Sequence, residues 1–210
     1  MNLFTVLRQH AASQAEAAAV AVPSANRIIT YRRLWSRIER GTARLQGEWA
    51  IEPGDTLAYW GSGHQDALVL YLALARCGAR LLPLEHPSQW RGGARLLSET
   101  ATKMVLHDDD AIAHWDSLGL LCKPLSSLII DRCLHQPMPR DDVRSPSLIR
   151  VIGAAEPAHR YSLSSLDQLT ERALTAQPAV QHIGEVLFDE AIFAPIALAT
   201  LIAGKTLLFS

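Results

Sequence analysis

One stretch in the first half of the chain, residues 56–85, constrains the fold more than any other part of the sequence. It consists of an apolar run (TLAYWG), a strongly apolar segment of helical length (HQDALVLYLALARCGA) and a second apolar run (RLLPLE). Short apolar runs predict buried strands, and the longer segment predicts a helix that ends at Gly78. Strand, helix and strand with connections this short are typical of parallel strands joined by a crossover helix.

The same alternation extends on both sides of that stretch. A β-branched run at Arg27–Thr30 leads into a predicted helix over residues 30–45, for which Thr30 is a suitable N-cap. A weaker helix, which contains two adjacent glycines, is predicted over residues 89–101, and a further strand over residues 103–109. The sequence therefore predicts an α/β protein with a mainly parallel sheet flanked by helices.

Residues 111–146 show a weaker pattern, in which a strand is predicted at residues 127–131. The proline-rich segment 135–146 predicts an exposed linker. We expect it to join two α/β blocks, residues 1–134 and 147–210. The elements expected in the second block are a strand (148–154), a helix (164–177), a short strand (185–188), an apolar helix (191–204) and a terminal strand (205–209).

Several classes of protein are disfavoured by composition. The 20 basic and 21 acidic residues nearly cancel, so there is no global basic field to attract nucleic acid. The three cysteines are scattered, which fits neither a disulfide framework nor a zinc site and favours the cytoplasm. The N-terminal residues 1–20 carry charges and predict a short amphipathic helix, and residues 191–204 are too short to span a membrane.

Residues 151–165 (VIGAAEPAHRYSLSS) are the main candidate site. A strand, a loop and a second strand are predicted there, which is a common arrangement for a phosphate-binding loop. The segment has one glycine, Gly153, and no lysine. It is therefore either an unusual nucleotide site or a β-hairpin that has lost its ligand.

Two other segments contain residue types found in ligand sites. His107, Asp110 and His114 could meet as metal ligands, although a solvated strand end followed by an exposed helix start is the favoured explanation. Residues 60–64 (WGSGH) form a predicted strand-to-helix turn that could hold an anion at the helix N-terminus, or could be purely structural. We assign no metal ligand and no catalytic residue.

Short motifs recur in a characteristic order along the chain. They are Thr30, Tyr31 and Leu34 (TY-x-x-L), Pro53, Gly54, Asp55 and Leu57 (PGD-x-V), Ala73, Gly78 and Ala79 (A-x-x-x-x-GA), Pro83, Leu84 and Pro87 (PL-x-x-P), and Ala203, Gly204 and Leu208 (AG-x-x-x-L). In this order and spacing they resemble the N-terminal region of adenylate-forming enzymes. That superfamily includes acyl- and aryl-CoA synthetases and the adenylation domains of nonribosomal peptide synthetases.

The resemblance assigns residues 151–165 to the family's loop for the phosphates of ATP. Backbone N–H groups, glycines and a lysine hold the phosphates in such a loop. The candidate phosphate-binding residues here are Gly153, His159 and Arg160, with Arg160 in place of the lysine. Pro157 lies near the expected position, whereas Glu156 would repel a triphosphate.

The family's adenine-binding motifs, its ribose-binding aspartate and its C-terminal lysine are expected beyond Ser210. We therefore expect a truncated homologue that is catalytically inactive alone, needs no cofactor, and acts as a binding or assembly partner. A homo-oligomer or a partner protein would cover the truncated face. No nucleic acid partner is expected.

Two alternatives remain open. The chain could be the N-terminal part of a split, AMP-forming acid–CoA or acid–carrier ligase, which would use ATP and Mg²⁺ when a second chain completes it. It could also be an unrelated small α/β binding protein.

Overall fold

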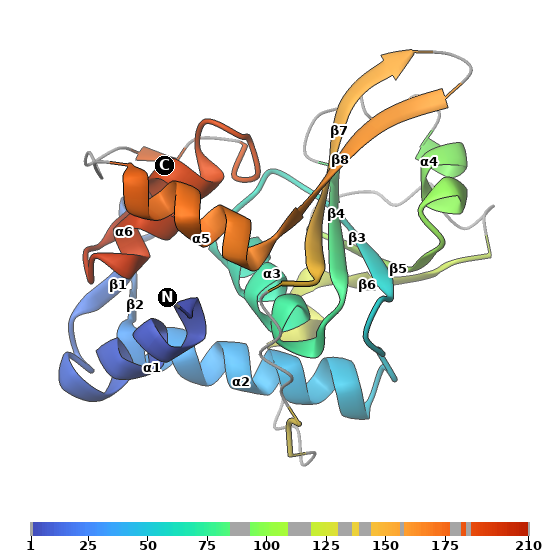
Figure 1. Cartoon of the computed structure of the whole chain (residues 1–210). Coiled ribbons are helices and arrows are strands. Elements are labelled where there is room, and N and C mark those ends of the chain that lie inside the picture. The colour runs from blue at the N-terminus through green and yellow to red at the C-terminus, as the bar shows by residue number, and fades with distance from the viewer. Residues whose placement is uncertain are drawn as a thin grey trace.

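The computed structural model describes residues 2–84, 93–108, 119–129, 136–138, 144–155, 158–176, 182–183 and 186–209. The described strands form one six-stranded and one four-stranded β-sheet, with helices packed against both (Figure 1). The predicted α/β class is thus confirmed.

The larger sheet has the strand order β6-β5-β3-β4-β7-β8. Its neighbouring strands are parallel, except for the antiparallel pair of β7 and β8. The strands are β3 (Thr56–Trp60), β4 (Arg80–Leu84), β5 (Thr102–His107), β6 (Leu121–Pro124), β7 (Pro146–Ala155) and β8 (Ala158–Ser165).

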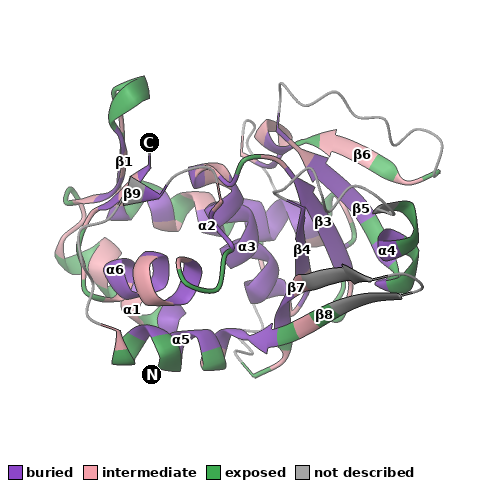
Figure 2. Cartoon of the chain, turned by 90° about the horizontal axis from the view of Figure 1, so that it is seen from above, coloured by how far each residue is buried: buried purple, intermediate pink, exposed green. Residues whose placement is uncertain are grey.

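Both faces of this sheet are covered, which explains why its central strands are continuously apolar. Alternate residues of β3 contribute to two separate apolar clusters, with Leu57 and Tyr59 in one and Ala58 and Trp60 in the other. The first cluster includes α3 (Gln65–Cys77), and the second includes residues of α4 (Gly93–Glu99). Figure 2 shows α3 and β3 among the most buried elements of the molecule.

Local signals place the helix ends as predicted. The Thr30 hydroxyl accepts the N–H of Arg33 at the start of α2 (Tyr31–Gly47). Gly78 ends α3 with φ at +74°, in the left-handed region that favours glycine. The helices α2 and α3 pack closely, because a Cβ added to Gly41 would lie only 3.1 Å from the Cβ of Ala73.

The smaller sheet joins the two ends of the chain, in the order β2-β1-β10-β9. Its strands are β1 (Ala18–Val22), β2 (Arg27–Thr30), β9 (His182–Ile183) and β10 (Leu207–Phe209). Tyr31 strengthens this junction, since its hydroxyl donates to the carbonyl of Lys205 at 2.8 Å. Each sheet combines strands from before and after residues 135–146. The division of the chain into two blocks, residues 1–134 and 147–210, stays a prediction.

Several sequence predictions need correction. The helix predicted within residues 1–20 covers only α1 (Leu3–Ser13). The strand β1 follows it and was not predicted. Residues 125–128 form a single 3₁₀ turn after β6, so the strand predicted at 127–131 is wrong in its described part. Residues 186–188 are irregular, and the short strand lies earlier, at His182–Ile183.

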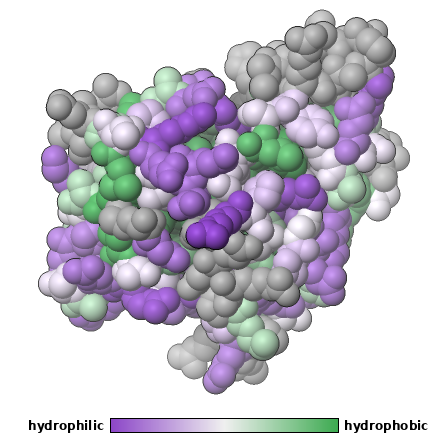
Figure 3. All heavy atoms as spheres, in the orientation of Figure 1, coloured by the Kyte–Doolittle hydropathy of each residue, from purple (hydrophilic) through white to green (hydrophobic). Residues whose placement is uncertain are grey.

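The predicted apolar helix at 191–204 exists but begins as a π-helical turn (Phe193–Leu198) before α6 (Ala199–Ile202). Pro195 explains the irregular start, because it has no N–H to donate to the preceding turn. The face shown in Figure 3 is mostly hydrophilic, with small, separate apolar groups.

Candidate functional site

The hairpin formed by β7 and β8 carries the predicted phosphate-binding residues. Gly153 pairs with Arg160 and Ala154 pairs with His159, so the backbone brings Gly153, His159 and Arg160 together near the hairpin end. Figure 1 shows this end projecting beyond the rest of the sheet. Glu156 and Pro157 lie outside the described residues, and phosphate binding here stays a prediction.

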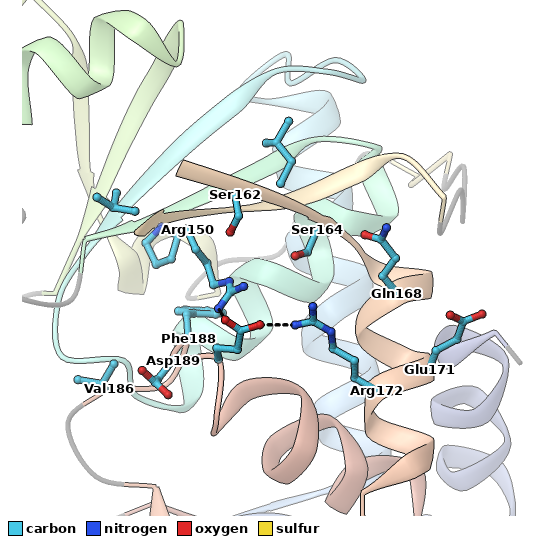
Figure 4. A pocket seen from close by; sticks show the side chains of 13 residues that line it. Arg150, Ser162, Ser164, Gln168, Glu171, Arg172, Val186, Phe188 and Asp189 are labelled. Carbon is cyan, nitrogen blue, oxygen red and sulfur yellow. Dashed lines mark hydrogen bonds and ion pairs between the residues drawn. The ribbon is translucent and has the colours of Figure 1, made fainter. Parts of the chain in front are cut away.

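A cavity of about 680 Å³ lies at the base of the same hairpin (Figure 4). Its walls come from the end of β4, from β7 and β8, from α5 (Leu166–Thr175) and from the segment before the π-helical turn. The lining residues are Pro83, Arg150, Val151, Ser162, Leu163, Ser164, Gln168, Glu171, Arg172, Val186, Phe188, Asp189 and Glu190. Ligands of open α/β sheets bind in such crevices near the carboxyl ends of strands.

Two arginines of this cavity share one carboxylate. A terminal nitrogen (Nη1) of Arg150 in β7 lies 3.0 Å from Oε2 of Glu190. The corresponding nitrogen of Arg172 in α5 lies 2.6 Å from Oε1 of the same residue. We call these three residues the Arg–Glu–Arg bridge. Hydrogen bonds from Arg150 and then from Arg172 hold the pKa of Glu190 below its usual value.

The sequence at the start of α5 fixes the position of Arg172. Ser165 follows directly from β8 and forms a capping box, in which its hydroxyl accepts the N–H of Gln168 and its own N–H donates to Oε1 of Gln168. Residues four apart share one helix face, so Gln168 and Arg172 both line the cavity.

A capping interaction also fixes the segment that carries Glu190. The carboxylate of the preceding residue, Asp189, accepts the N–H of Ala191 at 2.8 Å. The carbonyl of Asp189 accepts the N–H of Phe193, which starts the helical turn. The carboxylate of Asp189 is thereby bound to the backbone of Ala191, and the neighbouring Glu190 faces the two arginines.

Two polar atoms of the cavity wall are buried without a hydrogen-bond partner in the described part of the chain. They are Nε of Arg150 and the hydroxyl oxygen of Ser162, which faces Arg150 across the hairpin register. Buried polar groups are normally hydrogen-bonded, so these two atoms are exceptions within the described part of the chain.

A second polar cluster surrounds Asp108, directly after β5. Its Oδ1 accepts from the hydroxyl of Tyr59 at 2.7 Å and from Nε2 of His64 at 2.9 Å. Its Oδ2 accepts the backbone N–H of Ser62 at 2.8 Å. A Cβ on Gly61 would collide with this carboxylate. The glycine-bearing turn at residues 60–64 thus holds an anion, and that anion is the protein's own Asp108.

The titration of this cluster follows from its contacts. Burial raises the pKa of Asp108, but the hydrogen bonds from His64, Tyr59 and Ser62 outweigh burial and leave the pKa below its usual value. Burial lowers the pKa of His64, but its hydrogen bond to Asp108 and the charges of Asp108 and Asp66 outweigh burial and raise the pKa. Because Nδ1 of His64 accepts the N–H of Asp66, protonation there costs one helix-capping bond.

The metal site considered from the sequence is only partly described. Nδ1 of His107 lies 2.8 Å from the carbonyl oxygen of Asp108, whereas Asp110 and His114 lie outside the described residues. Over the described ranges, no three His, Cys, Asp or Glu side chains are arranged to hold a metal ion.

The sequence reasoning missed the Arg–Glu–Arg bridge. One signal was present, because Arg150 interrupts an otherwise apolar strand (LIRVIG). A charged residue inside a buried strand normally forms an ion pair or hydrogen bonds with another side chain. Its partner Glu190 lies in a loop whose position no local pattern indicates.

Comparison with known proteins adds to this geometry. A sequence profile described as "AMP-binding enzyme" matches residues 7–168, which is most of the chain. The chain belongs to the AMP-binding enzyme family. The resemblance to adenylate-forming enzymes is therefore confirmed.

Curated members of related sequence are much longer than this chain. A carboxylic acid reductase of Mycobacterium tuberculosis is 35% identical over 163 residues, which is 76% of this chain but 13% of that protein. A carboxylic acid reductase of Mycobacterium marinum is 30% identical over 92 residues, which is 44% of this chain and 8% of that protein.

Solved structures confirm the fold. The Klebsiella oxytoca NpsA N-terminal subdomain, in complex with 3-hydroxybenzoyl-AMSN, has a TM-score of 0.79 and 17% identity, and the match covers 99% of this chain and 53% of that one. Apo MatB from Rhodopseudomonas palustris has a TM-score of 0.81 and 19% identity, over 100% of this chain and 45% of that one. The chain thus spans about half the length of these structures. No helix in the described ranges is long and apolar enough to cross a membrane.

Proposed function

We propose that this AMP-binding family chain does not adenylate a substrate by itself and that it acts as a binding or assembly module. The observation that carries the proposal is the chemistry of the β7–β8 hairpin. It occupies the carboxyl edge of the sheet, yet its sequence offers one glycine, no lysine and the acidic Glu156. Binding of the ATP phosphates needs cations and close backbone N–H groups, which this composition supplies poorly.

The charges at the base of the hairpin support the same proposal. Both arginines of the cavity are bound by Glu190, so neither offers an unpaired positive charge to a triphosphate. Glu171 and Asp189 add further negative charge to the cavity wall. The cavity carries more acidic than basic side chains, which disfavours a polyanion such as ATP.

Calorimetric titration of the purified chain with ATP and Mg²⁺ tests the proposal. We expect no binding tighter than a Kd of about 1 mM. The matched variant is Arg160→Ala, because Arg160 is the cation that would replace the family's lysine. Tight ATP binding that Arg160→Ala abolishes would contradict the proposal.

An assembly role is supported by the edge of the larger sheet. The strand β8 ends the order of described strands, and its Tyr161 and Leu163 side chains are 42% and 47% exposed. An exposed edge strand with apolar side chains is suited to pairing with another chain. We therefore propose a homo-oligomer or a complex with a partner protein. Sedimentation velocity tests the homo-oligomer, and a monomer at all concentrations would rule it out.

The free thiols Cys77 and Cys122 support a reducing compartment, and we propose the cytoplasm. Fractionation of cells that express the tagged chain tests this location.

A second candidate function rests on the sequence relatives. The match to a carboxylic acid reductase at 35% identity covers only 13% of that protein. The chain could therefore contribute the N-terminal part of an AMP-forming ligase that acts with ATP and Mg²⁺ once further segments are supplied. Mixing the chain with separately produced remaining segments of such an enzyme should then give acid-dependent pyrophosphate release. No release at any ratio rejects this alternative.

A further inference from the structure

We infer that one face of the helix α2 is a docking site for an acidic α-helix of a partner protein. Arg33, Arg37 and Arg40 of α2 form this face together with Arg27 of β2, and we call it the arginine face. The inference rests on the proposed role as a binding module and names the chemistry of the partner. In Figure 1, α2 lies on the opposite side of the molecule from the projecting end of the β7–β8 hairpin, so the arginine face is separate from the candidate phosphate-binding loop.

The three arginines of α2 lie in one stripe along the helix. They are separated by four and then three residues, a spacing that places side chains on the same helix face. Glu39 is the only acidic residue of α2, and it follows Arg37 by two positions, so it lies on the opposite side of the helix. At about 1.5 Å per residue, the stripe from Arg33 to Arg40 extends over about 10 Å of the helix.

Asp66, at the start of α3, shows how a carboxylate is held on the arginine face. Its Oδ1 accepts a hydrogen bond from Nη1 of Arg37 at 2.9 Å, and its Oδ2 lies 3.8 Å from Nη1 of Arg27. The Asp66 side chain is only 15% exposed, and its backbone N–H donates to Nδ1 of His64. Asp66 is therefore a fixed part of this surface, and it supplies one negative charge to a face with four positive charges.

The remaining positive charge of the arginine face is not compensated within the described ranges. There, Arg33 and Arg40 form no ion pair, and Nε of Arg40 donates to a backbone carbonyl of its own helix. Burial lowers the pKa of Arg37 and Asp66 raises it, while the positive charges of Arg27, Arg40 and Arg33 lower it further. The arginines thus repel one another, so further carboxylates placed along the stripe would be favourable.

The shape of the arginine face and the charge of the whole chain favour an acidic helix over other anions. Guanidinium groups bind both carboxylates and phosphates, so the arginines alone do not distinguish the two. The 20 basic and 21 acidic residues of the chain give no long-range positive field, on which nucleic acid binding depends. A partner helix with carboxylates four and three residues apart repeats the spacing of the stripe, and it can present one carboxylate to each arginine of α2.

A synthetic helical peptide of about 20 residues is the probe, with glutamates four and three residues apart on one face. Fluorescence anisotropy of the labelled peptide measures its affinity for the whole chain at about 0.1 M salt, where distant charges are largely screened. The wild-type chain should bind this peptide and should not bind a peptide with glutamine at each glutamate position. Arg33→Gln combined with Arg40→Gln should weaken binding by about five- to tenfold, because two exposed ion pairs with the peptide are lost. Circular dichroism verifies that this variant is folded.

The matched control combines Arg32→Gln with Arg95→Gln. It also removes two exposed positive charges, but Arg32 lies off the stripe and pairs with Glu16, and Arg95 pairs with Glu99 in α4. The control should weaken binding by no more than about twofold. Asp66→Asn should instead tighten binding, because it frees two arginines for the peptide, and a folding defect could not produce such a gain.

The outcomes that would overturn the inference are distinct. Equal losses in the two double variants, or no gain from Asp66→Asn, would overturn the arginine face as the site. Equally tight binding of a proline-containing peptide with the same charge would overturn the helical partner, and tighter binding of single-stranded DNA would overturn the protein partner. The ATP titration and the sedimentation experiment contain no acidic peptide, so the proposed function can fail or hold independently of these results.

Discussion

Nε2 of His64 lies 2.9 Å from Oδ1 of Asp108, and this pair closes the turn between β3 and α3. The turn has the form of an anion-binding site, with glycines and a helix N-terminus. Because the protein supplies the anion from the end of β5, the site is structural: it connects the carboxyl ends of two neighbouring parallel strands, β3 and β5.

The first prediction concerns the charge of Asp108. Asp108→Asn should lower the free energy of unfolding by about 2 to 3 kcal/mol, because the hydrogen bonds from Tyr59, His64 and Ser62 lose their charged acceptor. Urea unfolding followed by circular dichroism measures the change. Glu52→Gln, at an exposed position, is the control for a simple loss of negative charge. Equal effects of the two substitutions would contradict a structural role for Asp108.

The second prediction is a pH dependence of the same contribution. The folded-state pKa of Asp108 lies below its unfolded value, so the unfolded state binds the proton more readily. The stabilisation by Asp108 is therefore present above the usual carboxyl pKa of about 3.9 and is lost as the pH falls through the lower folded-state pKa. Because Asp108 also raises the pKa of His64, the stability difference between wild type and Asp108→Asn should fall as the pH rises through the titration of His64. It should also shrink below about pH 4, where Asp108 becomes protonated. Unfolding curves across that range provide the measurement.

The third prediction concerns the space around Asp108. A Cβ at Gly61 would collide with the carboxylate of Asp108 and the hydroxyl of Tyr59, so Gly61→Ala should cost about 1 to 3 kcal/mol or more of stability. Gly54→Ala is an informative comparison, because Gly54 has φ at +88° and open space around it. Its cost should reflect backbone strain alone, at about 1 to 2 kcal/mol. A combined variant with Asp108→Ala should recover part of the loss at Gly61 but none at Gly54.

These relationships show which parts of the structure the sequence could predict. The N-cap at Thr30 and the C-terminal glycine at Gly78 depend on neighbours within a few residues, and both predictions are confirmed. The parallel strands β3 and β4 were also predicted, because apolar runs with a helix between them permit few other arrangements.

Long-range pairing could not be predicted from local pattern. The strand β1 pairs with β10 at the opposite end of the chain, and nothing within the short run Ala18–Val22 indicates that partner. The candidate site has the same limitation, because Arg150 and Glu190 meet only after β7 and the segment before α6 have packed together. The sequence located the hairpin, whereas the charges at its base became apparent only from the fold.

The last prediction measures how firmly Glu190 is held. Since its side chain is mostly exposed, Glu190→Gln should lower the free energy of unfolding by less than about 1 kcal/mol. A double-mutant cycle with Arg172→Gln should give a coupling energy of about 0.2 to 1 kcal/mol, which falls as salt is added. A coupling above about 2 kcal/mol would mean that the bridge is an integral part of the folded structure.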